Sequence, residues 1–201
     1  MSKTREHIIE VASRLMHVGG YNHTSIDELL KESGVGKGNF YYHFKSKEEL
    51  GYAIIESNLR KFSDLVLLRA FGNQKDAITQ IEEFLDIILG LHQRLNCAGG
   101  CPMGNMAMEM SDIHEGFRKK FQTVFESWRI QVAGALQKAK ASGQLREDVD
   151  PTRLAQFLIA GVEGAILLTK VKKDINILEN CFKELKTHFR MYLSHDIIFS
   201  D

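Results

Sequence analysis

The chain has 201 residues, of which 26 are Lys or Arg and 26 are Asp or Glu, so its formal net charge is zero. A chain of this length can bury a core in one or two domains, and its ordinary composition excludes a disordered or a membrane-spanning class. Because the whole chain is neutral, any affinity for nucleic acid must come from a local patch of charge.

The N-terminal stretch MSKTREHIIEVASRL carries charges among its first apolar residues, so it lacks the uncharged core of a signal peptide. The most apolar later run, FLIAGVEGAILL, is interrupted by Glu163 and is too short to span a bilayer. The three cysteines are odd in number, which indicates thiols rather than a disulfide framework. We therefore expect a cytoplasmic protein with no membrane partner.

The spacing of apolar residues is helical along nearly the whole chain. A first helix is expected over about 4–18, ended by Gly19 and Gly20. Thr24 is expected to cap a second helix that stops at Gly34, and a third helix follows from Gly36 or Lys37 to Phe44.

Ser46 is expected to cap a fourth helix that runs from Lys47 toward Leu68. No β-alternation is sustained enough to indicate a strand, so the predicted fold class is all-α. The remaining helices are expected at about 74–95, after Pro102, over about 114–141, from Asp150 and Pro151, and over about 175–193.

The stretch GVGKGNFYYHFKSKEEL, residues 34–50, is unusual for a core helix because it contains three glycines. Two short helices joined across 33–36 have the size of a helix-turn-helix, whose second helix enters the major groove of DNA. Without side chains at Gly36 and Gly38, the backbone can approach phosphates or base edges closely. Lys37 and Asn39 suit guanine and adenine edges respectively.

The rest of this stretch divides into a buried and a charged set. Phe40 and Phe44 are four residues apart and are expected to pack against the preceding helices. Between Lys31 and Lys47 there are four lysines and one acid, Glu32, which is a local basic patch. The alternative is a structural helical hairpin whose basic end is merely solvated.

This part of the chain resembles the DNA-binding domain of the TetR-type transcriptional regulators. The resemblance lies in the complete order of Thr24, a Gly-Val turn, KGNFYYHF and KSKEEL. The likeness is dense over about 4–55 and loose over the helical remainder. It implies a three-helix N-terminal domain over 1–50, with the helix-turn-helix at about 25–44, and a helical effector-binding and dimerisation domain over 51–201. It also implies about nine helices, a homodimer, a palindromic double-stranded DNA operator and a repressor released by a small molecule, with no cofactor.

The resemblance assigns roles to residues at matching positions. Gly36 departs from the family, which often has serine or threonine there, but glycine still suits a helix cap. The residues that the resemblance places at the DNA groove are Lys37, Gly38, Asn39 and Tyr42. The residues that it places at phosphates are Thr24, Tyr41, His43 and Lys47.

The last two helices are expected to form the dimer contact. Their apolar residues recur at spacings of three and four, and two glycines permit a close helix approach. The alternative is that both helices wrap the core of one protomer. The residues assigned to the interface are Gly161, Gly164, Leu178, Phe182, Leu185 and Phe189.

A methionine-rich segment and nearby aromatic residues suit an adaptable effector pocket. For each of these residues, ordinary packing in a helical bundle is the alternative. The pocket residues are Met103, Met106, Met110, Phe117, Phe121 and Trp128.

Cys97 and Cys101 are spaced by four, which is neither the CxxC of thiol oxidoreductases nor part of a zinc site, so no metal is expected. The surrounding GCPMGN and EMSD resemble a subgroup of the family that includes an electrophile-sensing repressor. A thiol at a helix N-terminus is more reactive, so Cys101 is a candidate redox sensor, and Cys97 is a second candidate. The alternative is a small residue that fits a tight turn.

Two other classes of function compete with a DNA-binding regulator. An enzyme would need a clustered nucleophile and base, a phosphate loop or a metal motif, and the sequence has no GxSxG, phosphate loop or HExxH. A helical protein-interaction module, or a thiol sensor that acts through another partner, would leave the basic patch without a DNA role. We therefore expect a regulator and not an enzyme.

Overall fold

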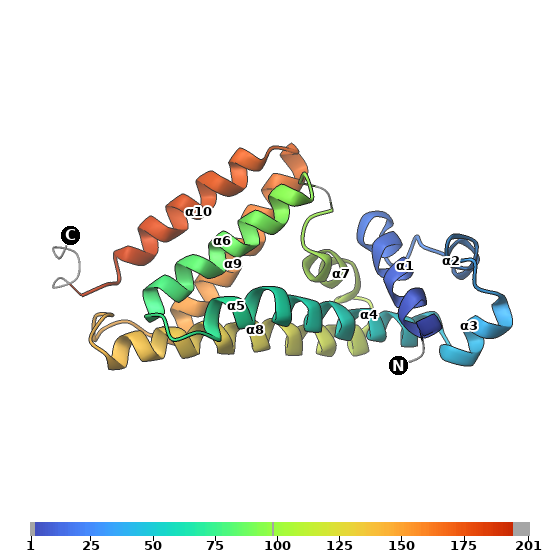
Figure 1. Ribbon diagram of the computed structural model, residues 1–201, viewed down its shortest axis with the longest axis horizontal. Coiled ribbons are helices and arrows are strands. Elements are labelled where there is room, and N and C mark those ends of the chain that lie inside the picture. Colours follow the sequence, from blue (N-terminus) through green and yellow to red (C-terminus); the bar gives the residue numbers. More distant parts are fainter. Residues whose placement is uncertain (1–2, 98, 195–201) are drawn as a thin grey trace. The chain divides into compact units, whose positions relative to one another are not determined.

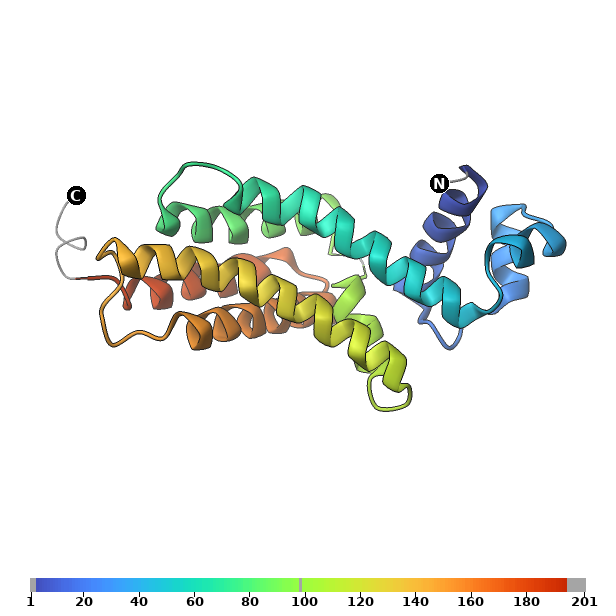
Figure 2. The ribbon, with the colours of Figure 1, turned by 90° about the horizontal axis from the view of Figure 1, so that it is seen from below.

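The computed structural model describes residues 3–97 and 99–194, and over these ranges it contains helices and no named strand (Figure 1). A π-helical turn, Ser63–Leu67, joins α4 to α5 so that they form one continuous helix (Figure 2). Counted this way, the described residues form the nine helices that the resemblance implies. The helices are α1 (Lys3–Gly19), α2 (Ile26–Ser33), α3 (Lys37–His43), α4 (Lys47–Phe62), α5 (Leu68–Phe71), α6 (Ala77–Arg94), α7 (Pro102–Met110), α8 (Glu115–Ala141), α9 (Pro151–Lys172) and α10 (Ile175–Arg190).

The chain divides into two compact units, each built from separated stretches of sequence. Unit 1 contains 1–61 and 101–124, so α1 to α3 and most of α4 share it with α7 and the start of α8. Unit 2 contains 62–100 and 125–201. The boundaries of these units differ from the expected boundary at residue 50. That boundary separates a DNA-binding part from an effector-binding and dimerisation part, and this functional division stays a prediction.

In unit 1, α1, α2 and α3 lie together (Figure 1) around a core that includes Ile8, Leu29 and Phe40. The predicted cap of α2 was wrong by one residue. Ser25 is the N-cap and its hydroxyl accepts from the amide of Glu28 at 3.0 Å. Thr24 is buried instead, and its hydroxyl donates to the carbonyl of Gly20 at 2.8 Å.

In unit 2, α9 and α10 pack against each other across a short turn at Lys173 and Asp174. Close approach is possible at Gly161, where an added Cβ would lie 2.6 Å from Leu185. One set of the side chains expected at the dimer interface is already buried in the protomer's own core, and their part in a dimer contact stays a prediction. They are Leu178, Phe182, Leu185 and Phe189.

A different face of α9 is apolar and exposed. It follows a helical spacing and includes Gly164, whose added Cβ would meet nothing within 4 Å. By length and composition α9 is apolar enough to cross a membrane, but its other face is buried in unit 2, and the core helix of a globular protein passes the same test. We call this face the α9 stripe; it consists of Phe157, Ala160, Gly164, Leu168 and Val171.

Candidate functional site

Glycines set the entry to α3. Gly34 ends α2 in the left-handed region with φ 66°, a conformation that costs glycine little and other residues much. Gly36 is the N-cap of α3 and, as expected for glycine, makes no side-chain capping bond. Gly36 has an extended backbone with φ −65°, so Gly34 is the position in this turn whose backbone favours glycine, and α3 begins at Lys37.

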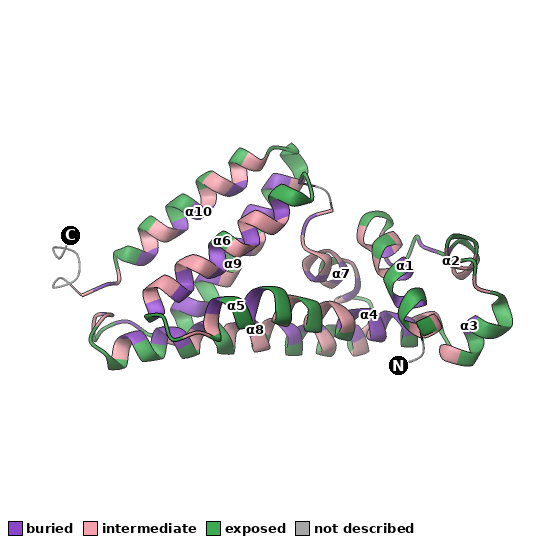
Figure 3. Ribbon diagram, viewed as in Figure 1, coloured by how far each residue is buried: buried purple, intermediate pink, exposed green. Residues whose placement is uncertain are grey.

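Two phenylalanines fix α3 from behind. Phe40 and Phe44 are fully buried, with ring centroids 5.9 Å apart, which confirms the expectation that they pack inward. The guanidinium of Arg5 on α1 lies 5.0 Å from the centroid of the Phe44 ring, a cation–π contact that adds a link to α1. The rest of α3 is largely exposed (Figure 3).

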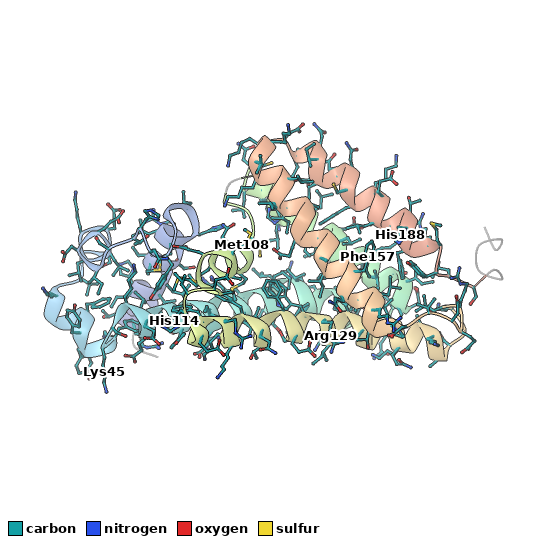
Figure 4. The ribbon with its side chains drawn as sticks, turned by 180° about the vertical axis from the view of Figure 1, so that it is seen from behind. Lys45, Met108, His114, Arg129, Phe157 and His188 are labelled. Carbon is teal, nitrogen blue, oxygen red and sulfur yellow. The ribbon has the colours of Figure 1, made fainter. Side chains whose placement is uncertain are left out.

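The residues expected to face the groove are on that exposed side. Lys37, Gly38 and Asn39 are exposed, and Tyr42 is 83% exposed. Lys45 follows α3 and its side chain extends away from the protein (Figure 4). This placement leaves their side chains available to base edges, and their contact with DNA stays a prediction.

The residues expected to contact phosphates divide into two groups. Tyr41 is 43% exposed and His43 is partly exposed, so both are accessible. Thr24 is 3% exposed and its hydroxyl already donates to Gly20, so its side chain is poorly placed for a phosphate.

Lys47 begins α4 and is half-buried. Its Nζ donates to the carbonyl of Asn22 at 3.2 Å and lies 4.6 Å from the centroid of the Tyr21 ring. Burial lowers the pKa of Lys47, and the negative charge of Glu109 opposes that shift. Since an ammonium has three donors, one hydrogen bond to Asn22 leaves two for a phosphate, and this role stays a prediction.

The start of α4 has the expected cap. The hydroxyl of Ser46 accepts from the amide of Glu49 at 3.1 Å, and the carboxylate of Glu49 accepts from the amide of Lys45 at 2.8 Å. These reciprocal bonds fix the segment that leads from α3 into α4.

The residues expected to line an effector pocket are all buried, as pocket residues and core residues both would be. Phe117 and Phe121 stack with centroids 6.3 Å apart in unit 1. Trp128 belongs to unit 2, where its ring lies 4.4 Å from that of Phe62 and 5.0 Å from that of Phe125. Met103, Met106 and Met110 lie on α7 in unit 1. An effector site at these residues stays a prediction.

One buried donor beside these rings has no partner. Among the described residues, the indole nitrogen Nε1 of Trp128 is the buried side-chain nitrogen or oxygen without a hydrogen bond. Leaving such a donor unpaired costs about 1–3 kcal/mol. A ligand with an acceptor at this position would remove that cost.

The cysteines occupy different environments. Cys101 is the N-cap of α7, is partly exposed, and its sulfur accepts from the amide of Gly104 at 3.3 Å. Cys97 is buried and has a positive φ of 60°. The placement at a helix N-terminus suits a reactive thiol at Cys101, and the sensor role stays a prediction.

The sequence reasoning missed Glu109, an acid on α7 between two methionines. Its carboxylate accepts from the amide of Tyr21 at 2.8 Å and from the amide of Asn22 at 2.6 Å. Burial, with further effects of nearby charges such as Glu48, raises the pKa of Tyr21 to about 12. A single acid within a methionine-rich helix was the available signal, but nothing in the sequence named its partner.

Comparison with known proteins agrees with this geometry. The family described as "Bacterial regulatory proteins, tetR family" matches residues 8–54, and "Tetracyclin repressor-like, C-terminal domain" matches residues 77–185. The first match covers α2, α3, most of α1 and the first half of α4, and the second covers α6 to α9 and most of α10.

Individual relatives match over nearly the whole chain. An uncharacterised HTH-type transcriptional regulator of Lactococcus lactis is 33% identical over 94% of each chain. The HTH-type transcriptional repressor NemR of Escherichia coli K12 is 27% identical, with 91% of this chain and 92% of NemR covered. The crystal structure of a TetR transcriptional regulator from Chloroflexus aurantiacus is 31% identical with a TM-score of 0.87, covering 95% of this chain and 96% of the other.

Proposed function

The chain belongs to the TetR family of bacterial regulatory proteins, and we propose that it represses transcription by binding a palindromic operator as a homodimer, with one α3 in each half-site. The protein is a DNA-binding transcriptional regulator of a family whose members are not enzymes. The observation that carries the proposal is α3 itself, which is braced by two buried phenylalanines and presents exposed polar side chains.

The dimer in this proposal uses the α9 stripe. A palindrome requires two recognition helices about 34 Å apart, and a two-fold interface uses the same surface from both protomers. The stripe supports this role because it combines exposed apolar residues with the open surface at Gly164.

Release from DNA is proposed to follow the binding of a small, largely apolar molecule beside Trp128. The rings of Phe62 and Phe125 offer apolar surface, and the unpaired indole N–H offers one directional contact. A cytoplasmic location follows from a role on the bacterial chromosome.

Selection of random duplex fragments by the purified protein tests the DNA proposal. We expect the retained fragments to share a palindrome, and binding to them to weaken steeply with salt because phosphate contacts release counterions. Retention of no duplex at low salt would contradict the proposal and favour a protein-interaction module. A non-palindromic consensus would contradict the dimer alone.

A further inference from the structure

The turn between α1 and α2 is held by a residue outside the helix-turn-helix. Glu109 lies on α7, and its two carboxylate oxygens accept from the consecutive amides of Tyr21 and Asn22 at 2.8 and 2.6 Å. Bonds from amides to an ionised carboxylate are shorter and stronger than neutral ones. Both partners belong to unit 1, so the contact is a property of one compact unit.

The same turn is held from its other side by the segment after the recognition helix. Lys47, the first residue of α4, donates to the carbonyl of Asn22 at 3.2 Å. Asn22 therefore uses its amide toward Glu109 and its carbonyl toward Lys47. The elements before and after α3 thus meet at one residue, and α7 fixes that residue.

The backbone of the turn is shaped to receive the carboxylate. Gly20 has φ 89°, and an added Cβ would lie 3.3 Å from Oε2 of Glu109. The carbonyl of Gly20 accepts from the hydroxyl of Thr24 at 2.8 Å, directly before the Ser25 cap of α2. A shift of this turn would therefore move the start of α2, and with it the helix-turn-helix.

We propose that Glu109 is a positioning residue for operator recognition: by capturing the Tyr21 and Asn22 amides it sets the orientation of α2 and α3, and it makes that orientation depend on α7. The proposal rests on the DNA-binding function. Glu109 itself touches no DNA, and it acts through the α1–α2 turn and through Lys47.

The sign of the effect separates positioning from simple electrostatics. Removing a negative charge from a DNA-binding unit should strengthen its attraction to any duplex, since the repulsion of phosphates falls. Loss of positioning should instead weaken binding to the operator while leaving non-specific binding equal or stronger. The ratio of the two affinities is therefore the quantity to measure.

The test compares four proteins: the unchanged protein, Glu109→Gln, Glu109→Ala and the control variant Met108→Ala. Gln keeps one acceptor oxygen but turns an NH₂ group toward the second amide, and Ala removes both acceptors. Met108 is the adjacent α7 residue and is 65% exposed, so it controls for change on the same helix. Three readouts are taken: thermal unfolding, amide exchange at Tyr21 and Asn22 without DNA, and affinity for the selected operator and for a scrambled duplex.

We expect the amides of Tyr21 and Asn22 to exchange slowest in the unchanged protein, faster in Glu109→Gln and fastest in Glu109→Ala. Operator affinity should fall in the same order, by at least about fivefold for Glu109→Gln. The ratio of operator to scrambled-duplex affinity should fall at a temperature where every variant is folded, and Met108→Ala should match the unchanged protein. Faster exchange with unchanged or stronger operator binding would overturn the proposal, as would protected amides in Glu109→Ala.

The test still decides the proposal if one variant does not fold, and it separates the proposal from a failure of DNA binding. If Glu109→Ala does not fold, Glu109→Gln, which has the same size, carries the comparison. If the unchanged protein binds no duplex, the DNA-binding function fails instead, and the exchange data still report the turn contact separately.

Discussion

Phe40 and Tyr42 are two residues apart on α3 and have opposite environments. Phe40 is fully buried, whereas Tyr42 is 83% exposed. One side chain therefore holds the recognition helix in place, and the other is available to DNA. Substitutions at the two positions should separate stability from recognition.

We expect Phe40→Ala to lower the free energy of unfolding by about 3–5 kcal/mol, because it empties a fully buried aromatic site. Tyr42→Ala should change that free energy by no more than about 0.5 kcal/mol, as is usual for exposed positions, but should alter which operator is preferred. Chemical denaturation and repeated duplex selection measure the two effects. The division of roles would be contradicted if Tyr42→Ala destabilised the protein as much as Phe40→Ala.

At this scale the sequence was informative wherever residue type alone decides the structure. The glycine at Gly34 and the buried pair Phe40 and Phe44 were predictable, because a helix end with a positive φ favours glycine and phenylalanines four residues apart share one face of a helix. The choice between Thr24 and Ser25 as a cap was not, because both hydroxyls can accept an amide and only the turn geometry selects one.

At the scale of a single helix, α9 and α10 show why an apolar pattern is ambiguous. The apolar residues of α10 recur at helical spacing, yet the protomer core buries them, while α9 keeps apolar residues exposed. Periodicity identifies a buried face, but it does not say whether the covering surface comes from the same chain or another. Within one protomer the apolar face of α10 is buried, whereas the α9 stripe is exposed.

Leu168→Glu tests the α9 stripe, and Ile130→Glu on α8 is its matched control. The two side chains are 51% and 53% exposed, so both variants should fold normally. A two-fold interface repeats the substitution, and each buried unpaired charge is costly. We expect the dimer dissociation constant to rise at least about 100-fold for Leu168→Glu, measured by analytical ultracentrifugation.

The control should behave like the unchanged protein. If both variants stay dimeric at the same concentration, the dimer forms through another surface. If both dissociate equally, the effect comes from added charge and not from the stripe.

At the scale of the whole molecule, effector and operator binding must be coupled reciprocally. Trp128 is the only tryptophan in the chain, so its fluorescence reports directly on binding at the proposed effector site. A small molecule that shifts this fluorescence should weaken operator affinity, by about 5- to 150-fold for a typical coupling. Saturating operator should then weaken that molecule's affinity by the same factor.

Titration of the same molecule with and without operator DNA measures both factors. Trp128→Phe should lose the indole contact and bind the molecule more weakly while retaining operator affinity. A fluorescence change with no effect on DNA binding would place the molecule at a site unrelated to regulation.

For the whole molecule, the features that local sequence signals determine were predictable. The all-α class and the start of α9 at Asp150 and Pro151 follow from local signals. The π-helical turn at 63–67 and the contact between Glu109 and the α1–α2 turn were not predicted, and the contact joins residues 87 and 88 positions apart in the chain.

The assembly of unit 1 from 1–61 and 101–124 limits how this regulator can exchange parts with its relatives. A hybrid joined once near residue 50 would take Tyr21 and Asn22 from one parent and position 109 from the other. The DNA-reading helices would then be inherited without the acid that anchors them, unless both parents carry it. Between parents that differ at position 109, recombination that preserves operator choice would therefore have to transfer two separate segments of the gene together.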